Sequence, residues 1–150
     1  PRSRGLGDVY KRQGLNAMAT YFGTSINESP TIIMEAGAKL EDVQGIALAI
    51  TAGKLAKPSA GANVIGLSLF TNDENVEAGG SLTVQVKDIG KWVAGEAIAV
   101  GDELATDAAG KAVKATDGAF IVGIALSAAA KAGTVVSVQL TKSGYKPKAS

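Results

Sequence analysis

Short apolar runs separated by glycine- and aspartate-containing turns dominate the second half of the chain. Between residues 101 and 140 the pattern predicts four strands: one ending at a turn over 107–110, one beginning at Lys111, one over 120–126 and one over 135–140. Asp-x-x-Gly and Asp-Gly favour hairpin turns, because Asp caps the turn and Gly tolerates a positive φ. The pattern therefore predicts antiparallel strands joined by hairpins.

The last of these strands alternates clearly between apolar and polar residues. Val136, Val138 and Leu140 fall on one face, and Ser137 and Gln139 fall on the other. This alternation is typical of a strand with one buried and one solvated face.

The same pattern occurs earlier in the chain, 57 residues before. Ala-Gly-Lys-x-x-Lys begins at Ala52 and again at Ala109, and the apolar positions that follow match without a gap around Gly66 and Gly123. The chain is therefore predicted to be a tandem repeat of one β-rich unit, with the two copies related by a pseudo-twofold arrangement. The two strand glycines should lie where a backbone or a bulky side chain passes close by.

These elements predict a mainly β fold: two tandem β-hairpin-rich repeats that form a small β-barrel or sandwich-like body with an N-terminal arm. The arm is expected over 18–34, without a counterpart in the second repeat, and the β-rich domain over 35–140, with repeats at about 36–87 and 93–140. Residues 141–150 are expected to be a Lys-rich tail. Residues 3–13 resemble an in-frame translation of a sequencing adapter, so 1–17 are predicted to be an artefact or a leader.

Setting the first 13 residues aside changes the charge. Lys and Arg together fall from 15 to 11 and Asp and Glu from 14 to 13, so the formal net charge moves from +1 to −2. A slightly negative chain without a basic and aromatic face is a poor candidate for nucleic-acid binding. No apolar run approaches the roughly 20 residues that a membrane-spanning helix requires.

The residue types that are missing exclude most catalytic chemistry. The chain has no His and no Cys, and no Arg follows Arg12. A Ser-His-Asp triad, a zinc site of Cys and His, and an arginine fork for phosphate therefore cannot be built from residues 14–150. We predict that the protein is not an enzyme and has no catalytic, cofactor-binding or metal-binding residues.

One group of motifs resembles a known family. The pattern Gly101-Asp102-x-Leu104-x-x-Asp107-x-x-Gly110-Lys111, the strand over 121–126, Ala132-Gly133 and Val136-x-Val138 together resemble tailed-phage capsid decoration (cement) proteins. The resemblance covers about 37–140, with glycines 53, 66 and 79 as its echoes in the first repeat. The first repeat departs from the pattern, because it has Gly45-Ile46 in place of the Gly-Asp pair.

The resemblance implies a structural virion protein that binds the outside of a phage capsid and stabilises the mature head. It also implies the major capsid protein as partner, a homo-oligomer with a trimer favoured, no cofactor, and a location on the capsid exterior after synthesis in the bacterial cytoplasm. The possible partner contacts are apolar or aromatic and lie mostly outside the repeats; they are Tyr21, Phe22, Ile32, Ile33, Trp92 and Tyr145.

Several alternatives stay open at this point. The protein could instead be a carbohydrate- or surface-binding β module of a virion appendage, which would require exposed aromatic residues clustered beside polar ones. Trp92 could pack between the repeats or anchor a partner. The N-terminal arm could be a frayed end or could add a strand to a neighbour, and the tail around Tyr145 could be solvated or could contact an acidic surface.

Overall fold

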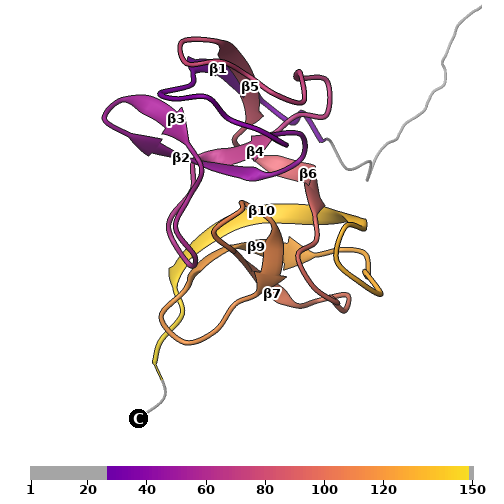
Figure 1. The fold of residues 1–150 in the computed structure, drawn as a ribbon. Helices are drawn as coiled ribbons and strands as arrows, with labels where there is room; N and C mark the ends of the chain where they lie inside the picture. Colours follow the sequence, from indigo (N-terminus) through magenta and orange to yellow (C-terminus); the bar gives the residue numbers. More distant parts are fainter. Residues whose placement is uncertain (1–26, 149–150) are drawn as a thin grey trace, which may run out of the picture.

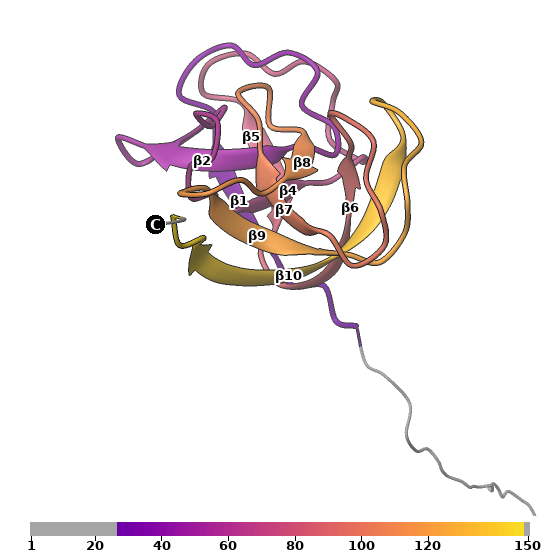
Figure 2. The ribbon, with the colours of Figure 1, turned by 90° about the horizontal axis from the view of Figure 1, so that it is seen from below.

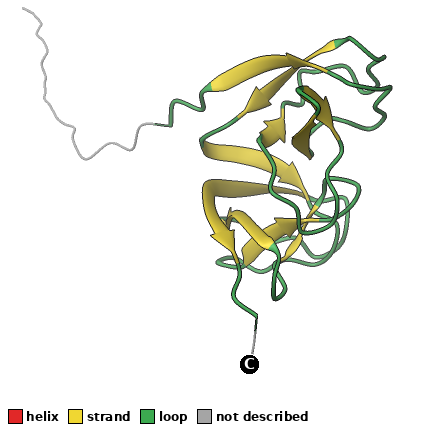
Figure 3. Cartoon of the chain, turned by 90° about the vertical axis from the view of Figure 1, so that its left-hand side faces the viewer, coloured by secondary structure: helices red, strands yellow, loops and turns green. Residues whose placement is uncertain are grey.

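The computed structural model describes residues 27–148, which fold into two five-stranded antiparallel sheets. Over these residues there are strands and loops and no helix (Figure 3), hence no helix that could cross a bilayer. The first sheet contains β1 (Thr31–Glu35), β2 (Ala47–Thr51), β3 (Lys54–Ala56), β4 (Gly66–Ser68) and β5 (Ser81–Gln85). The second contains β6 (Asp88–Val93), β7 (Glu103–Thr106), β8 (Ala112–Lys114), β9 (Phe120–Ala125) and β10 (Val135–Tyr145).

The two sheets have the same topology. Their strand orders are β1-β5-β4-β2-β3 and β6-β10-β9-β7-β8, so each strand of the first corresponds to the strand five places later in the second. We call residues 31–85 the first unit and residues 88–145 the second unit. The units lie one above the other, and β6 leads from the first to the second (Figure 1). The predicted mainly β fold and its duplication are confirmed.

The register of the strands also repeats. Leu48 pairs with Gly66 in the first unit, and Leu104 pairs with Gly123 in the second. A Cβ atom on Gly66 would lie 2.0 Å from the carbonyl oxygen of Gln85, and one on Gly123 would lie 2.3 Å from that of Gln139. Both positions require glycine because a neighbouring backbone passes too close for any side chain, as the sequence predicted.

The turns also form where the sequence places them. The side chain of Asp107 accepts hydrogen bonds from the backbone N–H groups of Ala109 and Lys111 at 2.9 and 2.8 Å. Gly110 and Gly118 have φ values of 86° and 85°, in the left-handed region that glycine tolerates. β9 and β10 then run side by side as an antiparallel pair, which is visible from below in Figure 2.

Each unit has its own apolar core. In the first unit Leu48, Leu55, Leu82 and Val84 are fully buried. In the second unit the core is built around Trp92 and includes residues of the first unit as well, namely Ala47, Val64 and Leu67. The two units are therefore packed into one body.

The hydrogen bonds between the units do not form symmetry-related pairs. The N–H of Val93 donates to the carbonyl of Gly45 at 2.8 Å, and the N–H of Ala47 donates to the carbonyl of Gly110 at 2.7 Å. A twofold relation would require the corresponding bond from Glu35 to Gly101, and among residues 27–148 no such bond is formed. The expected pseudo-twofold relation is therefore wrong, and the joint between the units uses two different surfaces.

β1, β6 and the end of β10 lie outside the ranges expected for the two repeats. β1 lies in the expected N-terminal arm, yet it corresponds to β6, which lies in the segment expected to join the repeats. A comparison of residue types does not detect the correspondence between β1 and β6, because Met34 corresponds to Trp92 and Ile32 to Gly90. β10 continues into the expected tail, where Gly144 and Tyr145 pair with Ile121 and Phe120 after an irregularity in the register.

Candidate functional site

Several large apolar side chains of the described residues lie on the surface, where they are candidates for contacts with a partner. Eight aliphatic and aromatic side chains of the two units are between 39% and 70% exposed; they are Ile33, Ile50, Phe70, Ile89, Val100, Leu126, Val135 and Tyr145. Single exposed apolar residues are ordinary on protein surfaces, so their arrangement decides whether they form a site.

The most exposed of them, Ile33, lies in the middle of the edge strand β1. The N–H of Ala36 donates to the carbonyl of Gly80, and the carbonyl of Pro30 accepts from the N–H of Val86. The backbone groups of both residues therefore face β5. Because backbone groups alternate sides along an antiparallel strand, the N–H groups of Ile33 and Glu35 point away from β5. β3 borders the end of this outer edge, where Ala36 forms a bridge with Leu55 and the N–H of Gly37 donates to the carbonyl of Leu55 at 3.0 Å. Ile33 itself is 70% exposed.

The same edge carries an ion pair. The ammonium of Lys54, on β3, lies 2.5 Å from Oε1 of Glu35. The hydrogen bond and the positive charge of Lys54 both lower the pKa of the Glu35 carboxyl below its usual range. The pair is solvent-exposed, so it positions the two side chains more than it stabilises the fold.

The corresponding edge strand of the second unit, β6, is covered. Asn27 pairs with the backbone of Ile89: its Nδ2 donates to the carbonyl at 3.3 Å, and its Oδ1 accepts from the N–H at 3.0 Å. Further along, the N–H of Val93 donates to Gly45. β1 and β6 are thus equivalent edges that are each bridged just beyond their end, at Ala36 and at Ala94, and β6 is covered in addition by Asn27 and Gly45.

The segment before β1 is attached at the junction between the units. Oδ2 of Asp88 accepts hydrogen bonds from the backbone N–H groups of Glu28 and Ser29, each at 3.1 Å. Asp88 and Ser29 have positive φ values of 69° and 47°, which are uncommon for residues with a side chain. We call residues 27–29 with Asp88 and Ile89 the junction clasp. It holds residues 27–29 against the start of β6.

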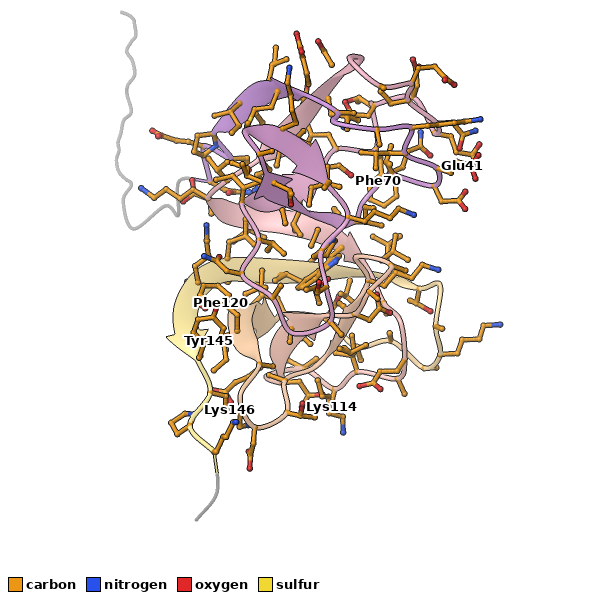
Figure 4. All side chains as sticks on the ribbon, turned by 60° about the vertical axis from the view of Figure 1, so that its left-hand side comes forward. Glu41, Phe70, Lys114, Phe120, Tyr145 and Lys146 are labelled. Carbon is orange, nitrogen blue, oxygen red and sulfur yellow. The ribbon has the colours of Figure 1, made fainter. Side chains whose placement is uncertain are left out.

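At the other end of the molecule, Tyr145 is the last residue of β10. It is 64% exposed, and its ring meets that of Phe120 edge to face, with 5.2 Å between centroids. Lys146 follows and its ammonium lies 3.2 Å from Oε1 of Glu103. Figure 4 shows Phe120, Tyr145 and Lys146 together on the second unit, away from Phe70 on the first. The exposed aromatic residues of the described chain therefore do not gather into a sugar-binding platform.

A further exposed residue, Val100, lies in a tight turn before β7. The N–H of Asp102 donates to the carbonyl of Ala99 at 3.1 Å, and the N–H of Ala99 donates to Oδ2 of Asp102 at 2.8 Å. Val100 is 65% exposed, and a Cβ atom built on Gly101 would meet nothing within 4 Å. The turn is closed by these two hydrogen bonds and is open to solvent.

The structure separates the six residues that the sequence singled out. Tyr21 and Phe22 lie outside the described residues. Trp92 is fully buried and its Nε1 donates to the carbonyl of Gly110 at 2.7 Å, so it belongs to the core. The other three lie on strands: Ile32 is half-buried against the first core, whereas Ile33 and Tyr145 are exposed on different units.

Sequence reasoning missed six exposed apolar residues, namely Ile50, Phe70, Ile89, Val100, Leu126 and Val135. All six are apolar residues inside or beside predicted strands, and apolar residues in such positions normally indicate a core. A signal existed for Val135, which shares its face with Ser137 and Gln139 rather than with buried Val136. Alternation along a strand could therefore have identified it.

Polar clefts offer no alternative site. One cleft beside the β7–β8 hairpin is lined by Glu96, Asp107 and Lys114. The carboxylate of Asp107 is used by its own turn, and that of Glu96 accepts the backbone N–H of Lys114 at 2.9 Å. Over residues 27–148 no three His, Cys, Asp or Glu side chains lie close enough together to hold a metal ion. The carboxylates of this cleft support turns and strands.

Comparisons with known proteins agree with an interaction role. The family model described as phage cement protein matches residues 24–140. Among solved structures, the N base of the head fiber gp8.5 of bacteriophage phi29 is similar, with a TM-score of 0.58 and 18% identity over 78% of this chain and 98% of that chain. At this identity the similarity concerns the fold alone. No curated protein matches the chain.

Proposed function

Since the chain belongs to the phage cement protein family, it is a structural virion protein of the capsid exterior, and we propose that it binds the major capsid protein as a trimer. The family is structural, so the chain is a structural protein and not an enzyme. The match over residues 24–140, which covers the first unit and all but the last five residues of the second, is the observation that carries this function.

The attachment combines the exposed β-strand edge with aromatic and apolar side chains. Ile33 on β1 and Tyr145 at the end of β10 offer apolar area that water covers in the free protein. Tyr21 and Phe22 precede the junction clasp by only a few residues and add two aromatic side chains. Aromatic residues are frequent among the side chains that dominate binding energy, which supports their role as anchors.

Stabilisation of the head follows from repetition. Each copy offers separated apolar side chains rather than one large patch, so a single contact is weak. A trimer that engages three symmetry-related capsid subunits makes the second and third contacts intramolecular, which raises the overall affinity without any new contact. Many such trimers on one shell oppose the outward pressure of packaged DNA.

Binding to heads tests the proposal directly. Purified full-length protein is mixed with expanded heads of the cognate phage and with unexpanded proheads, and each mixture is sedimented. We expect the protein to pellet with expanded heads and to raise the temperature at which DNA-filled heads release their DNA. Full-length protein that never pellets with cognate heads would overturn the function, and a monomer on the heads would overturn the trimer.

A further inference from the structure

The joint between the two units is a contact between unlike surfaces. The turn before β2 presents the carbonyl of Gly45, and the outer edge of β6 presents the N–H of Val93, which meet at 2.8 Å. Gln44 and Val93 also line one cleft, so the turn and the strand are neighbours beyond this hydrogen bond. A contact of unlike surfaces can be repeated from one body to the next.

The duplication supplies a second copy of each surface. Glu35 corresponds to Val93, because the residue that follows each one bonds equivalently: Ala36 to Gly80, and Ala94 to Thr134. Gly101 corresponds to Gly45, since Gly101 donates to Ala125 at 2.8 Å as Gly45 donates to Ser68 at 3.0 Å. Val100 then corresponds to Gln44.

Both of these second surfaces are open. Among residues 27–148 no loop carbonyl accepts the N–H of Glu35 as Gly45 accepts that of Val93, although β3 bridges Ala36 just beyond it, as β8 bridges Ala94 just beyond Val93. Ile33, two residues before Glu35, is 70% exposed. The turn that carries Gly101 is exposed, with Val100 at its tip. We infer that copies of this chain join head to tail, with the 99–102 turn of one copy against the β1 edge of the next. The N–H of Glu35 would donate to the carbonyl of Gly101 in the next copy.

The joint between copies is smaller than the joint within the chain. In the first unit the N–H of Gly61 donates to Thr106 of the second unit at 2.8 Å, whereas the equivalent N–H of Gly118 donates to Lys146 of its own β10 extension at 2.9 Å. The chain after β10 thus occupies part of the surface that a following unit would cover. Such a contact is weak alone and gains strength when a ring closes. The inference deepens the proposed trimer and rests on it only for the number of copies.

Engineered disulfides test this arrangement cleanly because the chain has no cysteine. The test variant carries Glu35→Cys and Val100→Cys. A positive control carries Gln44→Cys and Val93→Cys, the equivalent pair within the chain. A negative control carries Glu35→Cys and Val135→Cys, which places another exposed valine of the second unit in the same role. Each is oxidised mildly, both free and bound to expanded heads, and run on denaturing gels without reductant.

We expect the test variant to form covalent dimers and trimers that reductant reverses, the positive control to close within the monomer, and the negative control to remain largely monomeric. The inference is overturned if the test variant stays monomeric while the positive control closes, or if it cross-links no more than the negative control. Sedimentation of the same unoxidised variants with heads separates the two proposals. Normal head binding without cross-linking would leave the function standing and remove only this joint.

Discussion

At the scale of single residues, backbone proximity constrains this chain more than side-chain chemistry does. Gly66 and Gly123 lie at equivalent places in the two sheets, and each faces a carbonyl group of the neighbouring strand. The same local requirement thus occurs twice and is met by the same residue twice. The sequence comparison detected both glycines because no other residue type can replace them.

Substituting one of these glycines should therefore be costly. Gly123→Val places a branched side chain where a Cβ atom alone would lie 2.3 Å from the Gln139 carbonyl oxygen. We expect a loss at the upper end of the roughly 1–3 kcal/mol that overpacking costs, or more. Lys114→Ala, at an exposed strand position, should change stability by no more than about 0.5 kcal/mol. Urea denaturation followed by Trp92 fluorescence measures both, and equal midpoints for the two variants would contradict this account.

The ion pair on the β1 edge predicts a titration. Lys54 lowers the pKa of Glu35, so the pair favours the folded state above the pKa of the unfolded carboxyl, and this contribution disappears as pH falls through the folded pKa. Lys54→Met should raise the pKa of Glu35 towards its ordinary value. Carboxyl-carbon NMR titration measures the shift. Lys39→Met removes a lysine that pairs with Glu41 and Glu77 instead, and it should leave Glu35 unchanged.

At the scale of elements, the sequence predicted what depends on local turn chemistry. The hairpin at Asp107, the strand that begins at Phe120 and the alternation from Val136 onward all formed as expected. The equivalence of β1 and β6 could not be deduced from residue types, because it depends on the pairing of β1 with β5 and of β6 with β10, far along the chain. The sequence named Ile33 as a possible partner contact but could not place it at a sheet edge, because which strand lies at an edge is decided by topology.

β10 is also longer than the sequence predicts, because the residues Thr-Lys-Ser-Gly after Leu140 are polar and typical of a solvated tail. It nevertheless pairs with β9 and places Tyr145 against Phe120. Deleting residues 141–150 should therefore expose Phe120 and Ile121 and lower the melting temperature by several degrees. Differential scanning calorimetry measures this, with deletion of residues 149–150 as the control. An unchanged melting temperature would show that the extension does not stabilise the second unit.

At the scale of the whole molecule, duplication explains how a chain without reactive residues becomes an assembly protein. Two units joined through unlike surfaces leave one surface of each kind at the ends, here the β1 edge and the turn at Val100. The remaining charge is small, at −2 for residues 14–150, so association depends on shape and backbone pairing more than on long-range electrostatics. The junction clasp adds a fixed exit point for the residues that precede β1.

The last prediction concerns those preceding residues. Deleting residues 1–26 removes Tyr21 and Phe22 but keeps Asn27 and the other hydrogen bonds of the junction clasp. We expect an unchanged melting temperature and much weaker sedimentation with expanded heads, because the aromatic anchors are lost while the body is kept. Ordering this segment on a capsid costs about 1–2 kcal/mol per residue of backbone entropy, so only a few residues around the two aromatic side chains can contribute.

Two variants separate this anchoring from other effects of shortening the chain. Deleting residues 1–13 alone, the stretch that resembles a translated adapter, should leave both head binding and the melting temperature unchanged. Tyr21→Ser with Phe22→Ser, in the full-length chain, should weaken binding nearly as much as deleting residues 1–26, because burial of the two rings supplies most of the favourable energy. If the double variant pellets with heads as well as the unaltered protein does, the aromatic pair is no anchor. Attachment would then depend on the described body, beginning with the open edge of β1.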